Sequence, residues 1–350
     1  MLEQAYRENA RRKGLMIAAG IVFTLLAAYA FTTIGMREVS MSQTVSAIEQ
    51  WAGGTAGNGA DAATNKIILL LRLPRILLAI VAGAGLALAG ALMQSITRNY
   101  LVSPFTLGIS SAAALGASIC IVFAAGTAMD TDLGIILSAF TLSCVCGVLV
   151  YGIAQRAGLT PTTLVLVGIA LNYFFSALTA TLEFFAQEHK LAAVIQWTFG
   201  SLHRASWDYV VIGALIVAFG FAVAMFYCLP LNVMATSDDE TAVSLGVNPA
   251  RLRTIVGLAA VLMTAAIISF TGVIGFVGLI APHMARFLIG TDHRFYLPFT
   301  CVLGAALLLV SDTVGKLILY PVTVPVGIVI SFFGVPLFIH LILRRGKEFE

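Results

Sequence analysis

The chain has 350 residues, of which 59% are hydrophobic and only 11% are charged, and its mean hydropathy is +0.98. Such a composition leaves too little polar surface to cover a water-soluble domain, so it excludes a soluble protein and predicts an all-α protein that crosses a membrane several times. The formal net charge of +3 arises from 20 basic and 17 acidic residues. This charge informs orientation in the membrane and gives no sign of a nucleic-acid partner.

A membrane-spanning helix needs about 20 mostly apolar residues, and ten segments of the chain approach that length. They lie at residues 14–36, 74–95, 106–126, 133–155, 163–186, 207–230, 254–273, 274–290, 297–314 and 324–343. The seventh and eighth form one nearly continuous apolar stretch, which we divide at TGVIG because together they exceed a single bilayer crossing. The sequence therefore predicts ten transmembrane helices in one domain of residues 1–350.

Ten spans place both ends of the chain on one side of the membrane, and the positive-inside rule selects that side. With cytoplasmic termini, thirteen basic residues lie inside: Arg7, Arg11, Arg12, Lys13, Arg98, Arg156, Arg251, Arg253, Arg286, Arg294, Arg344, Arg345 and Lys347. Seven lie outside: Arg37, Lys66, Arg72, Arg75, Lys190, Arg204 and Lys316. The excess predicts that both termini are cytoplasmic. External arginines beside a span oppose the general bias and need a separate explanation.

Two polar segments separate predicted spans. The external segment, residues 37–66, contains WAGGTAGNGADAATN, and we expect a flexible surface loop without chemistry. The segment at residues 235–253 is the longest polar one predicted inside. There Thr236 or Ser237 can cap a short helix with acids in its first turn, and Gly246 can end it. Because so short a helix is unstable alone, we expect it to dock on another surface.

The two halves of the chain contain a weak repeat. From Arg72 an apolar span leads to Pro104, 32 residues further on, and from Arg251 another leads to Pro282, 31 residues further on. One copy starts outside the membrane and the other inside, as in the inverted repeats of many transporters. Chance similarity between helices rich in Gly and Ala accounts for the spacing equally well.

A membrane protein that moves a solute against a gradient needs an energy source, either ATP hydrolysis or an ion gradient. A phosphate-binding loop is absent, because neither Gly-Lys pair, Gly315-Lys316 or Gly346-Lys347, has the first glycine of that motif or the Ser or Thr after the lysine. Of the 17 acids, Glu183, Asp208 and Asp312 fall inside predicted spans, all near their external ends. Coupling to a proton or sodium gradient, which uses buried carboxylates, is therefore poorly supported.

The segment APHMARFL, residues 281–288, contains the histidine most suggestive of chemistry. His283 has neither a histidine nor an acid three or four positions further on, so a locally satisfied side chain at a Pro282 kink is favoured over a metal ligand. The His-Glu-x-x-His motif of metalloproteases is also absent from the sequence. We therefore predict no catalytic residue, no metal site and no cofactor in this chain.

Four long motifs closely resemble the permease subunit of ABC importers for iron siderophores, haem and vitamin B12. They are RLPRILLAIVAGAGLALAGALMQ at residues 72–94, RNYLVSPFTLGIS at 98–110, GFVGLIAPHMARFLIGTDHRFYLP at 275–298 and VPVGIVISFFGVPLFIHLILRR at 324–345. The resemblance implies a type II importer permease with ten transmembrane helices. It also implies a dimer with a second permease, either another copy or a sister chain, around a central path.

The resemblance further implies three sets of contact residues. The RLPR arginines and a basic residue before the last span meet an external substrate-binding protein in the family, which corresponds here to Arg72, Arg75 and Lys316. Lys316 stands where Arg is common, so a point charge replaces a bidentate fork. The family's ATPase-coupling helix corresponds to Glu240, Ala242, Leu245 and Gly246 in DDETAVSLGVNPARLR. Its cytoplasmic gate corresponds to Asn99, Leu101, Pro161 and Thr162, with proline at 161 departing from the expected polar residue.

The sequence thus predicts the transmembrane subunit of an ABC importer that carries a metal chelate, with a ferric siderophore favoured over haem, cobalamin or an oxyanion. The expected partners are two cytoplasmic ATPase subunits that hold ATP and Mg²⁺, and a periplasmic or lipid-anchored substrate-binding protein. The expected location is the cytoplasmic membrane of a bacterium or archaeon, in contact with lipid. The alternative is a secondary carrier or channel that acts without an ATPase.

Overall fold

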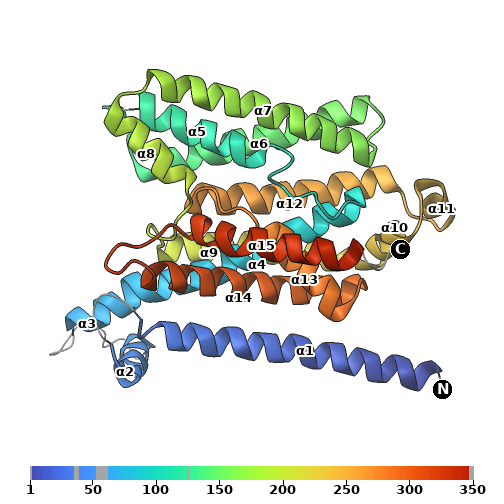
Figure 1. The fold of residues 1–350 in the computed structure, drawn as a ribbon, viewed down its shortest axis with the longest axis horizontal. Helices are drawn as coiled ribbons and strands as arrows, with labels where there is room; N and C mark the ends of the chain where they lie inside the picture. Colours follow the sequence, from blue (N-terminus) through green and yellow to red (C-terminus); the bar gives the residue numbers. More distant parts are fainter. Residues whose placement is uncertain (1, 35–38, 53–61, 125, 347–350) are drawn as a thin grey trace.

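The computed structural model describes residues 2–34, 39–52, 62–124 and 126–346, which form a bundle of roughly aligned helices (Figure 1). The described helices are α1 (Leu2–Phe31), α2 (Met41–Ala52), α3 (Ala62–Lys66), the π-helix η1 (Ile67–Arg72), α4 (Leu73–Thr97), α5 (Ile109–Phe123), α6 (Asp132–Arg156), α7 (Pro161–Phe185), α8 (Glu188–Thr198), α9 (Trp207–Phe226), α10 (Cys228–Thr236), α11 (Asp239–Ser244), α12 (Pro249–Thr271), α13 (Val277–Ile289), α14 (His293–Leu317) and α15 (Val326–Gly346). The all-α prediction is confirmed.

Every predicted span coincides with a helix. Seven helical stretches are long and apolar enough to cross a bilayer, and three shorter apolar helices, α5, α13 and α15, occupy the remaining predicted positions. The division at TGVIG is also confirmed, because Gly272 ends α12 with φ of 69° and Phe276 precedes α13 with φ of 63°. Whether all ten helices cross the membrane stays a prediction.

Helix α4 forms the centre of the bundle and packs against α12, α13 and α14. Its small residues make this possible. A Cβ atom on Gly83 or Gly90 would clash with the backbone of Gly304 on α14 or of Gly278 on α13. These glycines let backbones approach closely, which is how helices associate in membranes without a large hydrophobic driving force.

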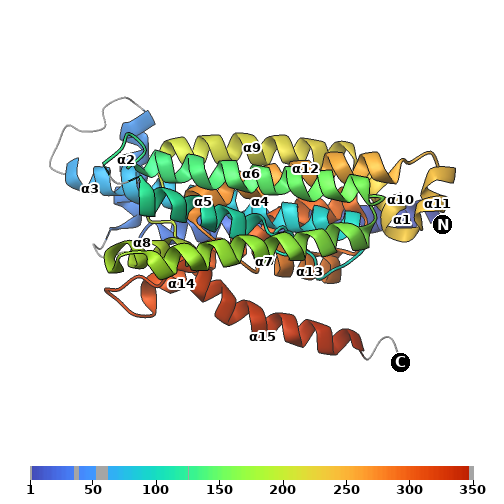
Figure 2. The same ribbon diagram turned by 90° about the horizontal axis from the view of Figure 1, so that it is seen from above.

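The inverted repeat appears in the arrangement of the helices. α4 and α12 run in opposite directions through the centre of the bundle (Figures 1 and 2). Each is followed by a non-helical break and then a shorter helix, α5 or α13, and the residue before that helix, Gly108 or Phe276, has a left-handed backbone. Two halves with the same sequence of elements and opposite direction are the plan of many transporters.

Both ends of the described chain and helix α11 lie at one end of the bundle, and α3 and α8 lie at the other (Figures 1 and 2). We call these the α11 end and the α3 end. Those basic residues predicted to face the cytoplasm that lie within the described residues gather toward the α11 end; Lys347 lies outside them. Arg72, Arg75 and Lys316 lie toward the α3 end.

The prediction of a flexible loop at residues 37–66 is wrong where the structure describes it, because α2 and α3 form there; residues 37–38 and 53–61 lie outside the described residues. Thr44 and Thr64 are buried, and Trp51 stacks on Trp207 of α9 with ring centroids 5.6 Å apart. Trp207 also donates its indole N–H to the Leu69 carbonyl at 2.9 Å. Tertiary contacts with the N-terminus of α9 therefore order a segment whose composition favours disorder.

Two predicted boundaries at the α11 end also differ. The span expected at 207–230 ends at Phe226, where the chain turns at Tyr227 into the separate helix α10. The polar segment expected at 235–253 includes the first turn of α12, which begins at Pro249 because Asn248 caps it by accepting from the Arg251 backbone N–H at 3.0 Å. Proline suits the first turn of a helix, where no hydrogen bond is lost.

Candidate functional site

Two of the three predicted docking cations meet at one buried acid near the α3 end. Arg75 lies in the first turn of α4 and contacts Asp312 of α14 through Nε and Nη2, with the shortest distance 2.8 Å. Lys316, one turn after Asp312, places its Nζ 2.6 Å from the other carboxylate oxygen. The Asp312 side chain is 3% exposed, whereas those of Arg75 and Lys316 are 15% and 19% exposed. Two cations thus share one anion, and the cluster keeps a net positive charge.

The third predicted cation, Arg72, ends the π-helix η1 and is half-buried. Its guanidinium donates to the carbonyl oxygen of Thr32, just beyond α1. π-Helical turns are rare and are frequent at functional sites. Nearby His203 contacts Arg75 Nη1 at 3.1 Å, and burial together with the charge of Arg75 lowers the pKa of this histidine. A neutral His203 therefore adds no charge to the cluster, which we call the Arg75 cluster (Arg75, Asp312 and Lys316).

Helix α11 is short and projects from the bundle (Figure 2). Its cap is Asp238, which accepts from the Thr241 backbone N–H at 2.8 Å, so the predicted caps Thr236 and Ser237 are wrong. Both of those side chains bond back to carbonyls of α10 instead. The predicted end is right, because Gly246 has φ of 82°.

The four residues matched to the coupling helix have different surroundings. Leu245 is 63% exposed, and Glu240 and Gly246 are also exposed. Ala242 is fully buried and faces the rest of the chain. An exposed leucine at the tip of a projecting helix is available to a partner, whereas Ala242 can only position the helix.

A second shared-anion cluster joins α11 to the bundle. Asp239, in the first turn of α11, contacts Arg253 of α12 through two bonds of 2.7 and 2.8 Å, and Arg98, at the end of α4, at 2.8 Å. Hydrogen bonding from Arg253 lowers the pKa of the Asp239 carboxyl. We call these three residues the Arg253 cluster.

Arg253 itself is 2% exposed and makes further contacts that tie the predicted gate segments together. Its Nε donates to the Ile96 carbonyl in the last turn of α4 at 3.2 Å, and its Nη1 donates to the Leu159 carbonyl in the α6–α7 connection at 3.3 Å. One side chain therefore links α11, α12 and both segments that precede the predicted gate residues.

The predicted gate residues lie just beyond these two carbonyls. Asn99 and Leu101 are exposed in the turn after α4, where the Asn99 side chain accepts from the Leu101 backbone N–H at 2.9 Å. Pro161 and Thr162 begin α7, whose cap is Thr160. Proline is well placed at this first turn, which gives its presence a structural reason.

Sequence reasoning missed Arg253, Arg98 and Asp239 as a unit, and it missed Asp312 as the partner of the docking cations. Arg253 was counted only as one of many cytoplasmic cations, and Asp312 only as an intramembrane acid. An acid one turn before Lys316 was the available signal for the external pair, since such spacing brings side chains together on a helix.

Residues 17–344 of the chain match the FecCD transport family. MJ0087 of Methanocaldococcus jannaschii, assigned as an ABC transporter permease protein, is 38% identical over 355 residues that cover 99% of each chain. YfmD of Bacillus subtilis, a permease protein of an Fe(3+)-citrate import system, is 32% identical over 350 residues and is covered completely, as is this chain. FhuG of the same organism, from an iron(3+)-hydroxamate import system, is 33% identical over 303 residues that cover 82% of this chain and 87% of FhuG.

The fold gives the same answer as the sequence comparison. A solved structure assigned as an inward-facing metal-chelate type ABC transporter superposes with a TM-score of 0.82 at 29% identity, covering 95% of this chain and 99% of the other. The helical bundle with its inverted repeat is thus that of a type II ABC importer permease, a multi-pass membrane protein. The chain belongs to the FecCD transport family.

Proposed function

We propose that this chain is the transmembrane half of an ATP-driven importer for an iron chelate, of which a ferric siderophore is the most direct candidate. The match to the FecCD transport family over residues 17–344 carries this proposal. Relatives named for Fe(3+)-citrate and iron(3+)-hydroxamate import support the substrate class. Haem, cobalamin and an oxyanion are the alternative substrates of a permease with this architecture.

In this proposal the α3 end faces outward and receives the substrate-binding protein, whether periplasmic or lipid-anchored. Arg72 and the net positive Arg75 cluster attract an acidic surface there, because complementary charge steers encounter and fixes orientation. Both termini and α11 then lie in the cytoplasm of a bacterial or archaeal cell. A second permease, a copy or a sister chain, completes the path.

At the α11 end, each of two ATPase subunits receives an α11 helix, with Leu245 as its apolar contact and Glu240 and Gly246 beside it. ATP and Mg²⁺ bind to these subunits, and this chain supplies no catalytic group. Movement of α11 is passed through Asp239 to Arg253, and from Arg253 to the ends of α4 and of the α6–α7 connection. The predicted gate residues Asn99, Leu101, Pro161 and Thr162 follow those two segments directly.

A carrier driven by an ion gradient is less well supported. Such carriers use an intramembrane carboxylate that gains and loses a proton or cation. Asp312, the buried acid of the predicted spans, is held by both Arg75 and Lys316. A carboxylate with two cationic partners stays ionised and has little room for a third cation.

Uptake by proteoliposomes tests the proposal. Vesicles contain this permease, its ATPase and its binding protein, and the probe is a radiolabelled ferric siderophore. We expect uptake only when ATP is present on the side of the membrane that holds the ATPase and when all three components are present. Uptake by the permease alone under a proton or sodium gradient would contradict the proposal.

A further inference from the structure

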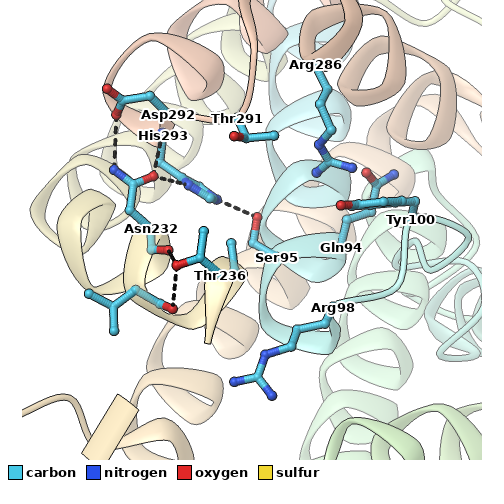
Figure 3. Close-up of a pocket in the computed structure, with 12 residues that line it drawn as sticks. Gln94, Ser95, Arg98, Tyr100, Asn232, Thr236, Arg286, Thr291, Asp292 and His293 are labelled. Atoms are coloured by element: carbon cyan, nitrogen blue, oxygen red, sulfur yellow. Dashed lines mark hydrogen bonds between the residues drawn. The ribbon is translucent and has the colours of Figure 1, made fainter. Parts of the chain in front are cut away.

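A polar cavity of about 600 Å³ opens between the last turn of α4, helix α10 and the adjoining ends of α13 and α14 (Figure 3). It lies at the α11 end, and Arg98 of the Arg253 cluster is the member of the two ion clusters that lines it. Residues that line it include Gln94, Ser95, Tyr100, Asn232, Arg286 and His293. Its volume lies in the range of small-molecule sites, about 300–1,000 Å³, and far exceeds that of one water molecule.

On one wall of the cavity the polar side chains form hydrogen bonds with one another. His293 contacts Ser95 Oγ at 2.7 Å through Nε2 and the Asn232 side-chain oxygen at 2.6 Å through Nδ1. Asn232 in turn donates to Asp292 at 3.0 Å. These groups form a closed hydrogen-bonded chain on the α10 side (Figure 3). They shape the cavity without needing a ligand.

The opposite wall carries the groups that lack partners. Gln94 is fully buried, and neither its amide nitrogen nor its amide oxygen has a hydrogen-bond partner among the described residues. A buried amide without partners is costly, because it has given up its hydrogen bonds to water and gained none in the protein. The side chain lies beside Arg286 and Tyr100 (Figure 3), at a place where a bound molecule can supply both missing bonds.

Arg286 supplies a positive charge beside this amide. Its guanidinium lies 3.9 Å from the ring centroid of Tyr100, and its Nη2 contacts the Tyr296 hydroxyl at 3.2 Å. Its Nη1 is buried and has no hydrogen-bond partner in the described part of the chain. Aromatic contacts thus hold the guanidinium in place and leave one N–H edge for an anion.

The other charges at the cavity are already compensated within the described residues. Arg98 pairs with Asp239, and Asp292 pairs with Arg294 at 2.7 Å. Arg286 has no acidic side chain within ion-pair distance in these segments. A single uncompensated cation next to an unpaired amide therefore sets the chemistry of the site.

We propose that this cavity binds a phosphate group, with Arg286 Nη1 and the Gln94 amide N–H donating to its oxygens and the Gln94 carbonyl accepting from a hydroxyl of the same ligand. A deprotonated carboxylate offers no donor, so it leaves the amide oxygen unsatisfied. Inorganic hydrogen phosphate keeps one O–H near neutral pH, whereas a phosphomonoester is mostly doubly deprotonated, because its second pKa is about 6, and offers a donor only through a hydroxyl of its esterified alcohol. The headgroup of an anionic glycerophospholipid combines the same charge with neighbouring hydroxyls.

Occupancy of the cavity bears on the predicted gate. Tyr100, which stacks on Arg286, lies between the gate residues Asn99 and Leu101. A phosphate on Arg286 therefore sits against the segment that must move when the cytoplasmic path opens. This consequence rests on the proposed transport function, whereas the binding itself does not.

The binding is tested on the full chain, purified in uncharged detergent without its ATPase, which would bind phosphate itself. Radiolabelled inorganic phosphate and glycerol 3-phosphate are measured by equilibrium dialysis. A second arm places the chain in nanodiscs of phosphatidylcholine with or without phosphatidylglycerol, and native mass spectrometry counts retained lipid. Saturable binding in the first arm identifies a soluble phosphate, and retention in the second alone identifies a lipid headgroup.

The variants are Arg286→Gln and Gln94→Leu, with Arg156→Gln as the control because Arg156 is exposed and lies away from the cavity. We expect affinity to fall about tenfold or more in Arg286→Gln, as for loss of a charged hydrogen bond, and several-fold in Gln94→Leu, with the control unchanged. If Arg286→Gln fails to fold, Arg286→Lys replaces it and should bind more weakly than wild type while remaining charged. No binding in either arm, or binding that Gln94→Leu and the Arg286 variant leave unchanged, would overturn the proposal.

Discussion

The Arg75 cluster and the Arg253 cluster have the same composition, two cations around one aspartate, but opposite burial. In the Arg75 cluster the acid is buried, with Asp312 3% exposed, and both cations reach further toward the surface. In the Arg253 cluster one cation is buried, with Arg253 2% exposed, whereas the second cation, Arg98, is 27% exposed and the acid Asp239 is 41% exposed. The first therefore presents positive charge at the α3 end, and the second fixes a cation inside the protein.

This difference gives the two clusters different physical roles. The partly exposed cations of the Arg75 cluster attract an acidic partner over a range set by the salt concentration. A buried arginine that bonds two carbonyls and one carboxylate resists separation of the elements that supply them, because each separated group would lose its partner. The α3 end is thus suited to docking and the α11 end to mechanical coupling. The predictions below test that assignment.

The largest effect on stability is expected from Arg75→Glu. The change removes one partner of buried Asp312 and places a second negative charge beside it, which should cost about 3–5 kcal/mol. Stability is measured by SDS-induced unfolding in mixed micelles, and Arg75→Lys, which keeps the charge, is the control. A stable Arg75→Glu protein would show that the pairing with Asp312 does not hold the cluster together.

A somewhat smaller loss, on the order of 3 kcal/mol, is expected from Asp239→Leu. Arg253 then remains buried with only two carbonyl partners, although partial exposure of Asp239 limits the cost. Uptake should also fall, because α11 loses its tie to the ends of α4 and the α6–α7 connection. Asp238→Ser, which preserves the helix cap, should leave both stability and uptake near wild type. Full uptake by Asp239→Leu would remove the Arg253 cluster from the coupling path.

Leu245→Asp should abolish uptake without changing stability. The side chain is 63% exposed, so charging it leaves the fold intact, but it places a charge where we propose an apolar contact with the ATPase. Leu245→Met is the matched control and should retain uptake. Unfolding curves and ATP-dependent uptake are compared for the three proteins, and normal uptake by Leu245→Asp would contradict the contact.

The smallest effect concerns acid stability at Asp292, which caps α14. Hydrogen bonds, led by those from Arg294, lower its pKa from 3.8 to about 2. Because the folded-state pKa lies below the unfolded value, this stabilisation is complete above pH 3.8 and is lost as the pH falls toward 2. The stability difference between wild type and Asp292→Asn should therefore shrink only in that window. A difference that stays constant from pH 5 to pH 2 would refute the assignment.

The sequence was sufficient to predict the helices but not the ion pairs. Apolar length located α4 and α12 to within a few residues, because a bilayer imposes a length that composition reveals directly. Pairs such as Arg75 with Asp312 join residues 237 positions apart, and no local pattern specifies them. The prediction of a flexible loop around Trp51 failed for the same reason, because the order of this segment comes from contact with the distant Trp207.

The assignment of the α3 end to docking is tested most directly at Arg72. This side chain lies outside the Arg75 cluster, so reversing its charge does not place an acid against Asp312. We predict that Arg72→Glu inserts and folds normally and binds the external substrate-binding protein at least about tenfold more weakly at low salt, with the deficit shrinking as ionic strength rises. Wild-type affinity of Arg72→Glu at low salt would contradict the account.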